Sequence, residues 1–486
     1  MAAATTRPDV EALRLLRAGK LQEAREFALR AVAGAGTCLP AHALLATVLH
    51  RLGHIDEAER TVVAALEQSP GVADAYDALA YVSMQLGRHE RANALYRRTV
   101  ELAPGDPRFW YNLASSERTF GRLEEAASAC DRAISLDAAQ YPSYLLRSEL
   151  RVQSATANHI DELQRQLSLR PADGRAQMFL GYALAKELDD VERYDEAFRW
   201  FSHAAATRRR HLAYDVAVDE RKLGRIAAAF SAQAMRKGID DGRSSRYIFI
   251  LGLPRSGTTL LERILTGLPG VLSNGETENF SRALLGVAPS EGADVFARAA
   301  AADPAAVGAH YGRLAGGSGH AHVIEKMPLN YLYLGAIQRA LPEAKLLLVR
   351  RAPLDSCFAM YRTLFGEAYP FSYDFQDIAR YYAAYERLIA HWLREFGDSI
   401  RQVAYEELVL APAQIGAAVA KHCGISWSAS AIDVQNNAAV SLTASAAQVR
   451  RPIYGSSSGR WRHYRQHLAP LIAALREREI SLPDDV

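Results

Sequence analysis

The sequence predicts an all-α solenoid of helical repeats followed by an α/β domain with a central parallel sheet. A 34-residue period runs through residues 5–207, and an apolar strand that leads through a glycine turn into a helix opens residues 246–486. Such strand–turn–helix units are typical of α/β proteins. Residues 208–245, Ala-rich and then polar, are predicted to form a helical linker. A chain of 486 residues is long enough for two sizeable cores.

The amino-terminal part repeats small residues at a fixed step of 34. These are Gly19, Gly53, Gly87 and Gly121, together with Ala24, Ala58, Ala92 and Ala126. Small side chains let two antiparallel helices approach closely, and glycine ends the first helix of each pair. This period is that of tetratricopeptide repeats, which the chain resembles. The resemblance implies a groove that docks a peptide or a protein partner, and the alternative is an array that only stabilises or oligomerises the protein.

Four complete repeats and two degenerate ones are predicted. The complete repeats occupy Thr5–Gly36, Leu39–Val72, Ala73–Asp106 and Pro107–Gln140. The degenerate repeats occupy residues 141–172 and 174–207, where the period weakens. In the last repeat, about four extra residues are expected between the two helices.

A turn at the start of the second part is predicted to bind an anion. The apolar run Tyr247–Leu251 predicts a buried strand, and the spacing of Leu260, Leu261 and Ile264 predicts a helix over Thr258–Leu265. The turn therefore lies at a helix N-terminus, where free N–H groups and the helix dipole attract negative charge. The amides in question belong to Ser256, Gly257, Thr258 and Thr259.

This turn has the spacing of a P-loop except at Thr258, which stands where a P-loop has lysine. That lysine reaches the nucleotide's β- and γ-phosphates, so a turn without it is poorly suited to ATP hydrolysis, and Arg255 offers a planar guanidinium instead. The run Pro254-Arg-Ser-Gly-Thr-Thr259 resembles the 5′-phosphosulfate loop of the sulfotransferase superfamily, in the form of its tyrosylprotein branch and many bacterial members. The resemblance implies 3′-phosphoadenosine 5′-phosphosulfate (PAPS) as the sulfonate donor.

A second apolar strand, residues 346–349, ends in two arginines. Ligands of open α/β sheets bind outside the carboxyl ends of the strands, so Arg351 is expected to face the same crevice as the turn. The segment resembles the family's 3′-phosphate segment, in which an arginine and a serine eight residues later hold the phosphate. Arg351 matches the arginine, but Ala359 replaces the serine, and Ser356 or a backbone amide could substitute. A solvated strand end is the alternative.

Sulfonate transfer needs a base for the acceptor hydroxyl and a cation near the departing bridge oxygen. If a short strand at Val271–Ser273 runs parallel to the first, Glu276 lies at the edge that carries the turn. The resemblance to the tyrosylprotein branch implies Glu276 as the general base and Lys326 as the cation, with Arg255 acting beside them. The alternatives are that the Glu276 carboxylate only stabilises the N-terminus of the following helix and that Lys326 lies at the surface.

Two further segments complete the expected donor site. Tyr405 follows a predicted strand at residues 400–403 and resembles the family's tyrosine at the adenine edge, and the alternative is a tyrosine of the core. Gly459 and Arg460 precede Trp461 in a Gly/Ser-rich basic segment that resembles the family's mobile phosphate-covering loop. The alternative for this segment is a flexible basic surface loop.

Composition limits the remaining possibilities. A net charge of +2 argues against nucleic-acid and membrane roles, and no apolar run is long enough to span a bilayer. The four cysteines are widely separated and form no CxxC motif, which favours a reducing compartment, and His310, His320 and His322 have no metal spacing. A cytoplasmic, bacterial-type protein without a metal is therefore expected.

The sequence as a whole predicts a PAPS-dependent sulfotransferase. A peptide or protein hydroxyl, first a tyrosine, is the expected acceptor, and the repeat array would dock the substrate or a partner. Three alternatives stay open: a repeat scaffold whose domain binds nucleotide without turnover, an enzyme that sulfates a carbohydrate, lipid or small metabolite, and a P-loop-like kinase. The missing lysine disfavours the kinase.

Overall fold

The computed structural model describes residues 7–34, 39–68, 71–230, 244–289, 294–317, 319–437, 439–440, 443 and 447–483. The chain divides into two compact units, and the division falls between Arg147 and Ser148. The complete repeats lie in the first unit. The division cuts the first degenerate repeat, whose residues from Ser148 onwards lie in the second unit with the last repeat and the α/β domain.

The first unit consists of helix pairs that match the predicted complete repeats. Its helices are α1 (Pro8–Arg17), α2 (Leu21–Gly34), α3 (Leu39–Arg51), α4 (Ile55–Glu67), α5 (Ala73–Gln85), α6 (His89–Leu102), α7 (Pro107–Phe120) and α8 (Leu123–Leu136). The recurring glycines each follow the first helix of a pair with positive φ, between 72° and 80°. Glycine adopts this conformation without steric cost, which explains its recurrence. The recurring alanines are fully buried.

The degenerate repeats continue the helical pattern with one difference from the prediction. Their helices are α9 (Tyr141–Glu149), α10 (Ile160–Ser168), α11 (Gly174–Asp190) and α12 (Tyr194–Arg210). The extra residues of the last repeat do not lengthen the connection between α11 and α12. Instead α11 has 17 residues, whereas α7 has 14, so the insertion adds about one helical turn.

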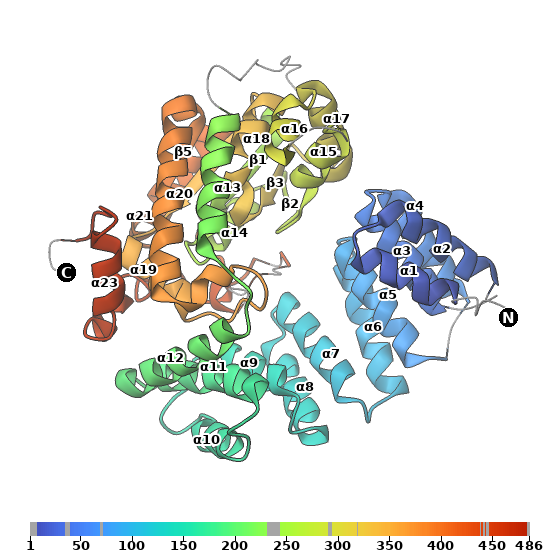
Figure 1. The fold of residues 1–486 in the computed structure, drawn as a ribbon, viewed down its shortest axis with the longest axis horizontal. Helices are drawn as coiled ribbons and strands as arrows, with labels where there is room; N and C mark the ends of the chain where they lie inside the picture. The colour runs from blue at the N-terminus through green and yellow to red at the C-terminus, as the bar shows by residue number, and fades with distance from the viewer. Residues whose placement is uncertain are drawn as a thin grey trace. The chain divides into compact units, whose positions relative to one another are not determined.

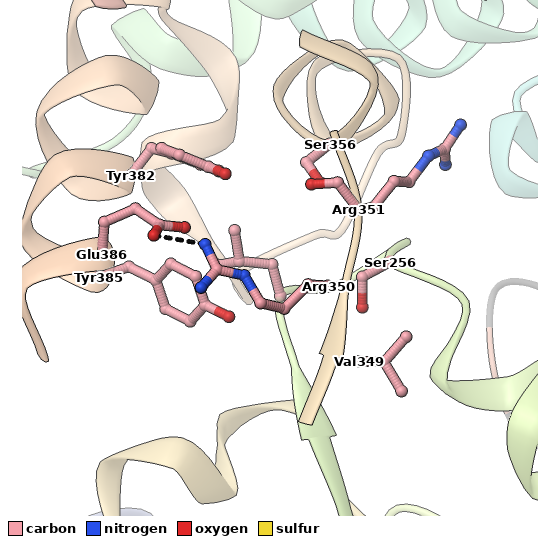
Figure 2. A pocket seen from close by; sticks show the side chains of 9 residues that line it. Ser256, Val349, Arg350, Arg351, Ser356, Tyr382, Tyr385 and Glu386 are labelled. Carbon is pink, nitrogen blue, oxygen red and sulfur yellow. Dashed lines mark hydrogen bonds and ion pairs between the residues drawn. The ribbon is translucent and has the colours of Figure 1, made fainter. Parts of the chain in front are cut away.

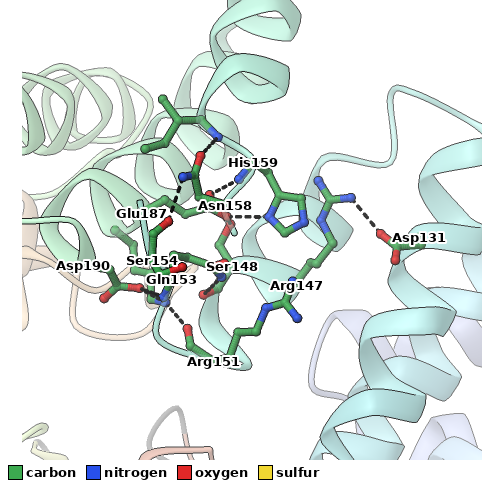
Figure 3. A network of polar contacts seen from close by, with 12 residues as sticks. Asp131, Arg147, Ser148, Arg151, Gln153, Ser154, Asn158, His159, Glu187 and Asp190 are labelled. Atoms are coloured by element: carbon green, nitrogen blue, oxygen red, sulfur yellow. Dashed lines mark hydrogen bonds and ion pairs between the residues drawn. The ribbon is translucent and has the colours of Figure 1, made fainter. Parts of the chain in front are cut away.

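This added turn of α11 carries acidic side chains that hold the connection between α9 and α10 (Figure 3). Glu187 accepts hydrogen bonds from the hydroxyl of Ser148 and from the backbone N–H of His159, each at 2.6 Å. Asp190 accepts from the backbone N–H of Gln153 at 2.8 Å. The connection between α9 and α10 is therefore fixed to α11.

Part of the predicted linker forms α13 (Val216–Ala229), which packs against α20 (Phe375–Phe396) of the α/β domain. The two helices lie side by side in Figure 1, and Arg380 of α20 pairs with Glu220 of α13. Residues 231–243 of the predicted linker lie outside the described residues.

The α/β domain is built on parallel strands in the order β2-β3-β1-β4-β5. The strands are β1 (Tyr247–Gly252), β2 (Val271–Ser273), β3 (His322–Lys326), β4 (Lys345–Arg350) and β5 (Ile400–Ala404). Because the strands are parallel, their carboxyl ends meet at one edge of the sheet. This confirms the predicted fold class, and β2 runs parallel to the other strands as the placement of Glu276 assumed.

Alternate residues of β1 face two helical layers. Ile248 and Ile250 belong to a core shared with α14 (Thr258–Thr266) and α22 (Pro412–Cys423). Phe249 belongs to the opposite layer, where its ring centre lies 5.9 Å from that of Phe280 and 5.3 Å from that of Tyr311. The other helices are α15 (Asn279–Val287), α16 (Val295–Ala301), α17 (Pro304–Ala315), α18 (Leu334–Ala340), α19 (Pro353–Tyr361), α21 (Tyr405–Leu410) and α23 (Ala469–Arg476).

Candidate active site

The turn between β1 and α14 places backbone amides at a helix N-terminus. A Cβ on Gly252 would lie 2.4 Å from the carbonyl oxygen of Val349, so glycine is needed for the turn to approach β4 this closely. Arg255 itself has a positive φ of 65°. Ser256 is buried, and its Oγ has no hydrogen-bond partner among the described residues. A buried hydroxyl of this kind at a helix N-terminus points to an anionic ligand.

Arg351 and Tyr405 close the turn from the side of β4 and β5. The Nη1 of Arg351 donates a hydrogen bond to the carbonyl oxygen of Arg255 at 3.0 Å. The Arg351 guanidinium also lies 4.7 Å from the centre of the Tyr405 ring. That ring packs on Gly257, where a Cβ would lie 2.4 Å from Tyr405 Cδ2. The structure therefore brings Arg351, Tyr405 and the turn together.

The two arginines at the end of β4 point in opposite directions (Figure 2). Arg350 donates from Nη2 to Glu386 of α20 at 2.5 Å, whereas Arg351 points towards the turn. A small pocket at this strand end is lined by both arginines, Ser256 and Ser356. The Ser356 hydroxyl donates to the carbonyl oxygen of Arg351 at 3.3 Å. Ser356 therefore supplies a hydroxyl beside Arg351.

Residues from the carboxyl-terminal part of the chain contact the turn. Arg255 donates from Nη2 to Gln448 Oε1 at 2.6 Å. The hydroxyl of Thr259 donates to that of Thr443 at 3.3 Å, and Thr258 and Thr259 are both buried. The base of the turn is therefore enclosed by protein.

Two residues of the predicted covering segment, Ser457 and Gly459, lie against the end of β4 and the start of α19. The carbonyl oxygen of Ser457 accepts a hydrogen bond from Nη2 of Arg351. The backbone N–H of Gly459 donates to Asp355 Oδ2 at 2.7 Å, in the first turn of α19. These contacts place Gly459 at the start of α19, close to Arg351.

Arg460 makes its charge-assisted contact with a repeat helix. Its Nη2 donates to Asp189 Oδ2 at 2.6 Å, and Asp189 lies in the added turn of α11. Arg362, which follows α19, also pairs with Asp189 at 2.5 Å. The structure thus places Arg460 in an ion-pair cluster that includes the last repeat.

Glu276 and Lys326, which the sequence predicts as base and cation, are in direct contact. The backbone N–H of Lys326 donates to the carbonyl oxygen of Gly275 at 3.0 Å, and this bond brings the loop after β2 to the end of β3. The Lys326 ammonium donates to Glu276 Oε1 and lies 3.7 Å from Glu262 Oε2. Lys326 is fully buried, whereas the Glu276 side chain is 31% exposed. Glu276 is therefore the more accessible member of the pair.

Glu262 of α14 adds a second carboxyl group beside Lys326. Its Oε1 accepts a hydrogen bond from the hydroxyl of Ser273 at 2.5 Å. Burial raises the pKa of Glu262, although Lys326 and Ser273 oppose that shift. Lys326 is thus held between Glu276, at the surface, and Glu262, in the interior.

Comparison with known proteins assigns both parts of the chain. The model of the sulfotransferase family matches residues 247–429. The α/β domain is a sulfotransferase domain. The model of the tetratricopeptide repeat matches residues 43–107 and 78–144, which confirms tetratricopeptide repeats in this part of the chain. This match supports sulfonate transfer as the reaction of the domain, and the tyrosylprotein branch stays a prediction.

Several proteins resemble parts of this chain. An uncharacterized protein of Aquifex aeolicus (strain VF5) is 27% identical over 359 residues, which cover 71% of this chain and 47% of that protein. The chain thus spans about half the length of this curated relative. The sulfotransferase domain of the Synechococcus PCC 7002 olefin synthase is 19% identical, over 51% of this chain and 98% of its own, with a TM-score of 0.36. A tetratricopeptide repeat protein from Parabacteroides merdae ATCC 43184 is 15% identical, over 42% and 83%, with a TM-score of 0.32.

Three residues that contact the predicted site of the sulfotransferase domain were not predicted from the sequence. Glu262 has a recognisable signal, because it is a carboxylate on the apolar stretch of a helix. Asp189 has a weaker signal, an acidic pair in the insertion of the last repeat. Gln448 has no signal of its own, since its role follows from the contact with Arg255.

The described part of the chain has no group of three or more His, Cys, Asp or Glu side chains placed to hold a metal ion. Each of its helices is too short or too polar to cross a lipid bilayer. The expected cytoplasmic location stays a prediction.

Proposed function

We propose that the sulfotransferase domain transfers a sulfonate group from PAPS to a hydroxyl of an acceptor. The proposal is carried by one observation: the buried hydroxyl of Ser256, at the helix N-terminus of residues 256–259, has no partner among the described residues and lines the same pocket as Arg351. In the reaction, the acceptor oxygen bonds to sulfur and the bond from sulfur to the bridging oxygen breaks. The acceptor proton passes to Glu276, and 3′,5′-adenosine bisphosphate leaves.

The turn between β1 and α14, residues 252–259, is called the donor turn below. Its residues and Arg351 suit the two anionic groups of PAPS. The amides of residues 256–259 and the Ser256 hydroxyl are proposed to hold the 5′-phosphosulfate, as donors at a helix N-terminus do. Arg351 is proposed to hold the 3′-phosphate, and its buried Nε has no partner within the described part of the chain. Ser356, which lines the same pocket, would replace the hydroxyl that Ala359 lacks. Tyr405 and Gly459 would flank the nucleotide.

Glu276 and Lys326 are proposed to share the chemistry. The hydrogen bond from Lys326 occupies Oε1 of Glu276, so Oε2 is left to accept the proton of the acceptor. The Lys326 ammonium would stabilise the charge that develops on the bridging oxygen. Glu262 helps to retain this ammonium at the end of β3. Arg255 would add a further cation at the mouth of the turn.

A peptide or protein hydroxyl, first a tyrosine, is the proposed acceptor. The tetratricopeptide repeats support this choice, because repeats of this kind present long grooves that bind chains. They would dock either the substrate or a partner protein. Ala359 favours a second candidate, a scaffold that binds nucleotide without turnover, because the expected serine is missing from the 3′-phosphate segment.

Donor binding is tested by thermal unfolding with 3′,5′-adenosine bisphosphate and, separately, with ATP and magnesium. Bisphosphate at 100 times its dissociation constant should stabilise the domain by about 2.7 kcal/mol. Arg351→Ala should abolish this stabilisation, while the exposed Arg401→Ala on β5 should retain it. Stabilisation by ATP alone would replace the proposal with a kinase, and no stabilisation by either ligand would remove the donor site.

Turnover is tested by transfer of labelled sulfate from PAPS to libraries of tyrosine peptides, carbohydrates, lipids and small hydroxyl compounds. Glu276→Gln should lower the rate by about 10²- to 10⁴-fold and leave bisphosphate binding unchanged. Glu278→Gln, a neighbouring carboxylate with a 66% exposed side chain, should change neither quantity. Bisphosphate binding without transfer to any library would establish the scaffold instead. Loss of binding in Glu276→Gln would give Glu276 a structural role.

A further inference from the structure

The added turn of α11 contributes one buried carboxylate to the sulfotransferase domain. The Asp189 side chain is 1% exposed, and its Oδ2 lies 2.6 Å from Nη2 of Arg460 and 2.5 Å from Nη2 of Arg362. Its Oδ1 accepts a hydrogen bond from the hydroxyl of Tyr464. Burial alone would raise the pKa of Asp189, but the two guanidinium groups outweigh burial and hold that pKa below its usual value. Asp189 is therefore a carboxylate shared by two cations at neutral pH.

Arg460 directly follows the loop that is predicted to cover the proposed donor site. The N–H of Gly459 donates to Asp355 at 2.7 Å, and the carbonyl oxygen of Ser457 accepts from Arg351. Arg351 also donates a hydrogen bond to the backbone of the donor turn, at Arg255. Contacts and the chain itself therefore connect Asp189, on a repeat helix, with Arg351, the residue proposed to bind the 3′-phosphate.

The composition of this loop explains why it needs such an anchor. Residues 455–459 are Gly-Ser-Ser-Ser-Gly, a sequence with little preference for one backbone conformation. If the loop were free, donor binding would have to supply the free energy for ordering it. The ion pair of the next residue, Arg460, with the buried Asp189 removes much of that cost before the donor arrives.

We propose that Asp189 is a positioning residue for donor binding: it fixes Arg460, and through Arg460 it holds the 457–459 loop over Arg351 and the donor turn. This inference rests on the proposed function and extends it. The last repeat then does more than dock a substrate, because its lengthened helix supplies a fixed point of the donor site.

Asp189→Asn is the variant that tests this role, since it keeps the shape of the side chain and removes its charge. Asp190→Asn is the matched control on the same helix turn. Asp190 pairs with Lys186 at 2.5 Å and accepts from the N–H of Gln153 at 2.8 Å, so it serves the connection between α9 and α10 instead. Arg460→Ala is the second test variant, because Asp189 keeps its pair with Arg362 and the fold retains that contact.

Two measurements on the full chain give the readouts. The first is deuterium exchange of peptides covering residues 453–460 in the ligand-free protein, and the second is calorimetric titration with 3′,5′-adenosine bisphosphate. Asp189→Asn should speed the exchange of this loop and raise the dissociation constant about tenfold. Arg460→Ala should reproduce both effects, and the combined variant should add nothing further. Asp190→Asn should match the wild type in both measurements.

Unchanged loop exchange in Asp189→Asn and Arg460→Ala would overturn the inference, and so would faster exchange with an unchanged dissociation constant. Equal effects of Asp189→Asn and Asp190→Asn would also overturn it, because they would reflect a general loosening of α11. If the wild type itself does not bind the bisphosphate, the proposed function fails. The exchange measurement, which needs no ligand, still decides in that case whether Asp189 holds the loop.

Discussion

Gly257 joins the donor turn to the ring of Tyr405, and a single methyl group at this position should separate them. Gly257 has a φ of 102°, and an added Cβ would lie 2.4 Å from Tyr405 Cδ2. The ring is buried beneath Arg351 and has little room to move. We expect Gly257→Ala to lower the free energy of unfolding by about 2–3 kcal/mol and to weaken bisphosphate binding. Urea unfolding and calorimetric titration measure the two effects.

Gly424 provides the control for this substitution within the same domain. It follows α22 with a φ of 73°, and a Cβ there would meet no atom within 4 Å. Gly424→Ala should therefore cost only the backbone strain, about 1 kcal/mol, and leave bisphosphate binding unchanged. Equal losses in the two variants would mean that the contact with Tyr405 contributes nothing.

The residues of the site differ in how far the sequence alone could locate them. The donor turn and Arg351 were predictable, because each lies in a local motif whose strand and helix context is also local. The contact between Glu276 and Lys326 could be anticipated only through the assumption of parallel strands. Asp189 could not be found in this way, because its partner Arg460 is 271 residues away in the sequence. Only the folded chain shows that the two charges meet.

At the scale of the element, the neighbouring charged residues Glu325 and Lys326 of β3 face opposite sides of the sheet. Lys326 faces the site, whereas Glu325 is fully buried and accepts a hydrogen bond from Asn330 at 2.9 Å. Burial raises the pKa of Glu325 from its usual 4.5 to about 7. The folded state therefore binds more protons than the unfolded state between these pH values. The contribution of Glu325 to stability is complete below pH 4.5 and is lost as pH rises through 7.

Glu325→Gln should remove this pH dependence. The free energy of unfolding of the variant should therefore rise relative to that of the wild type from pH 5 to pH 8. The expected change is about 1.4 kcal/mol for each unit of the pKa shift in that window. Urea unfolding at the two pH values measures the difference. Glu278→Gln, which removes an exposed carboxylate, is the control. A variant that differs from the wild type equally at both pH values would show that Glu325 does not titrate in this range.

The elements also show where prediction from the sequence reached its limit. The repeat helices were predictable from their period, and the parallel sheet was predictable from apolar runs that precede turns and helices. The sequence predicts the insertion of the last repeat between its two helices, whereas in the structure the insertion extends α11. Residues 183–190, Ala-Leu-Ala-Lys-Glu-Leu-Asp-Asp, contain several strong helix formers, so the helix continues for another turn. The period alone does not distinguish a longer helix from a longer loop.

At the scale of the whole molecule, the last repeat is joined to the sulfotransferase domain by packing as well as by charge. The Phe198 ring of α12 stacks 4.5 Å from that of His467. The Tyr182 hydroxyl donates to the carbonyl oxygen of Tyr361 at 3.1 Å, and Arg209 pairs with Asp377 at 2.7 Å. These contacts explain why the division into compact units falls before α10 and not at the predicted linker.

Truncation should therefore depend strongly on where the chain is cut. A chain of residues 141–486 keeps α9 to α13, and we expect it to unfold cooperatively and to bind bisphosphate as the full chain does. A chain of residues 244–486 loses the packing of α11 to α13, which is worth several kcal/mol against a typical domain stability of about 5–15 kcal/mol. It should aggregate or melt at a much lower temperature, as followed by circular dichroism and size-exclusion chromatography. If the shorter chain instead melts at the same temperature and binds with the same dissociation constant, the last repeats are separable from the enzyme and serve only as an attached docking array.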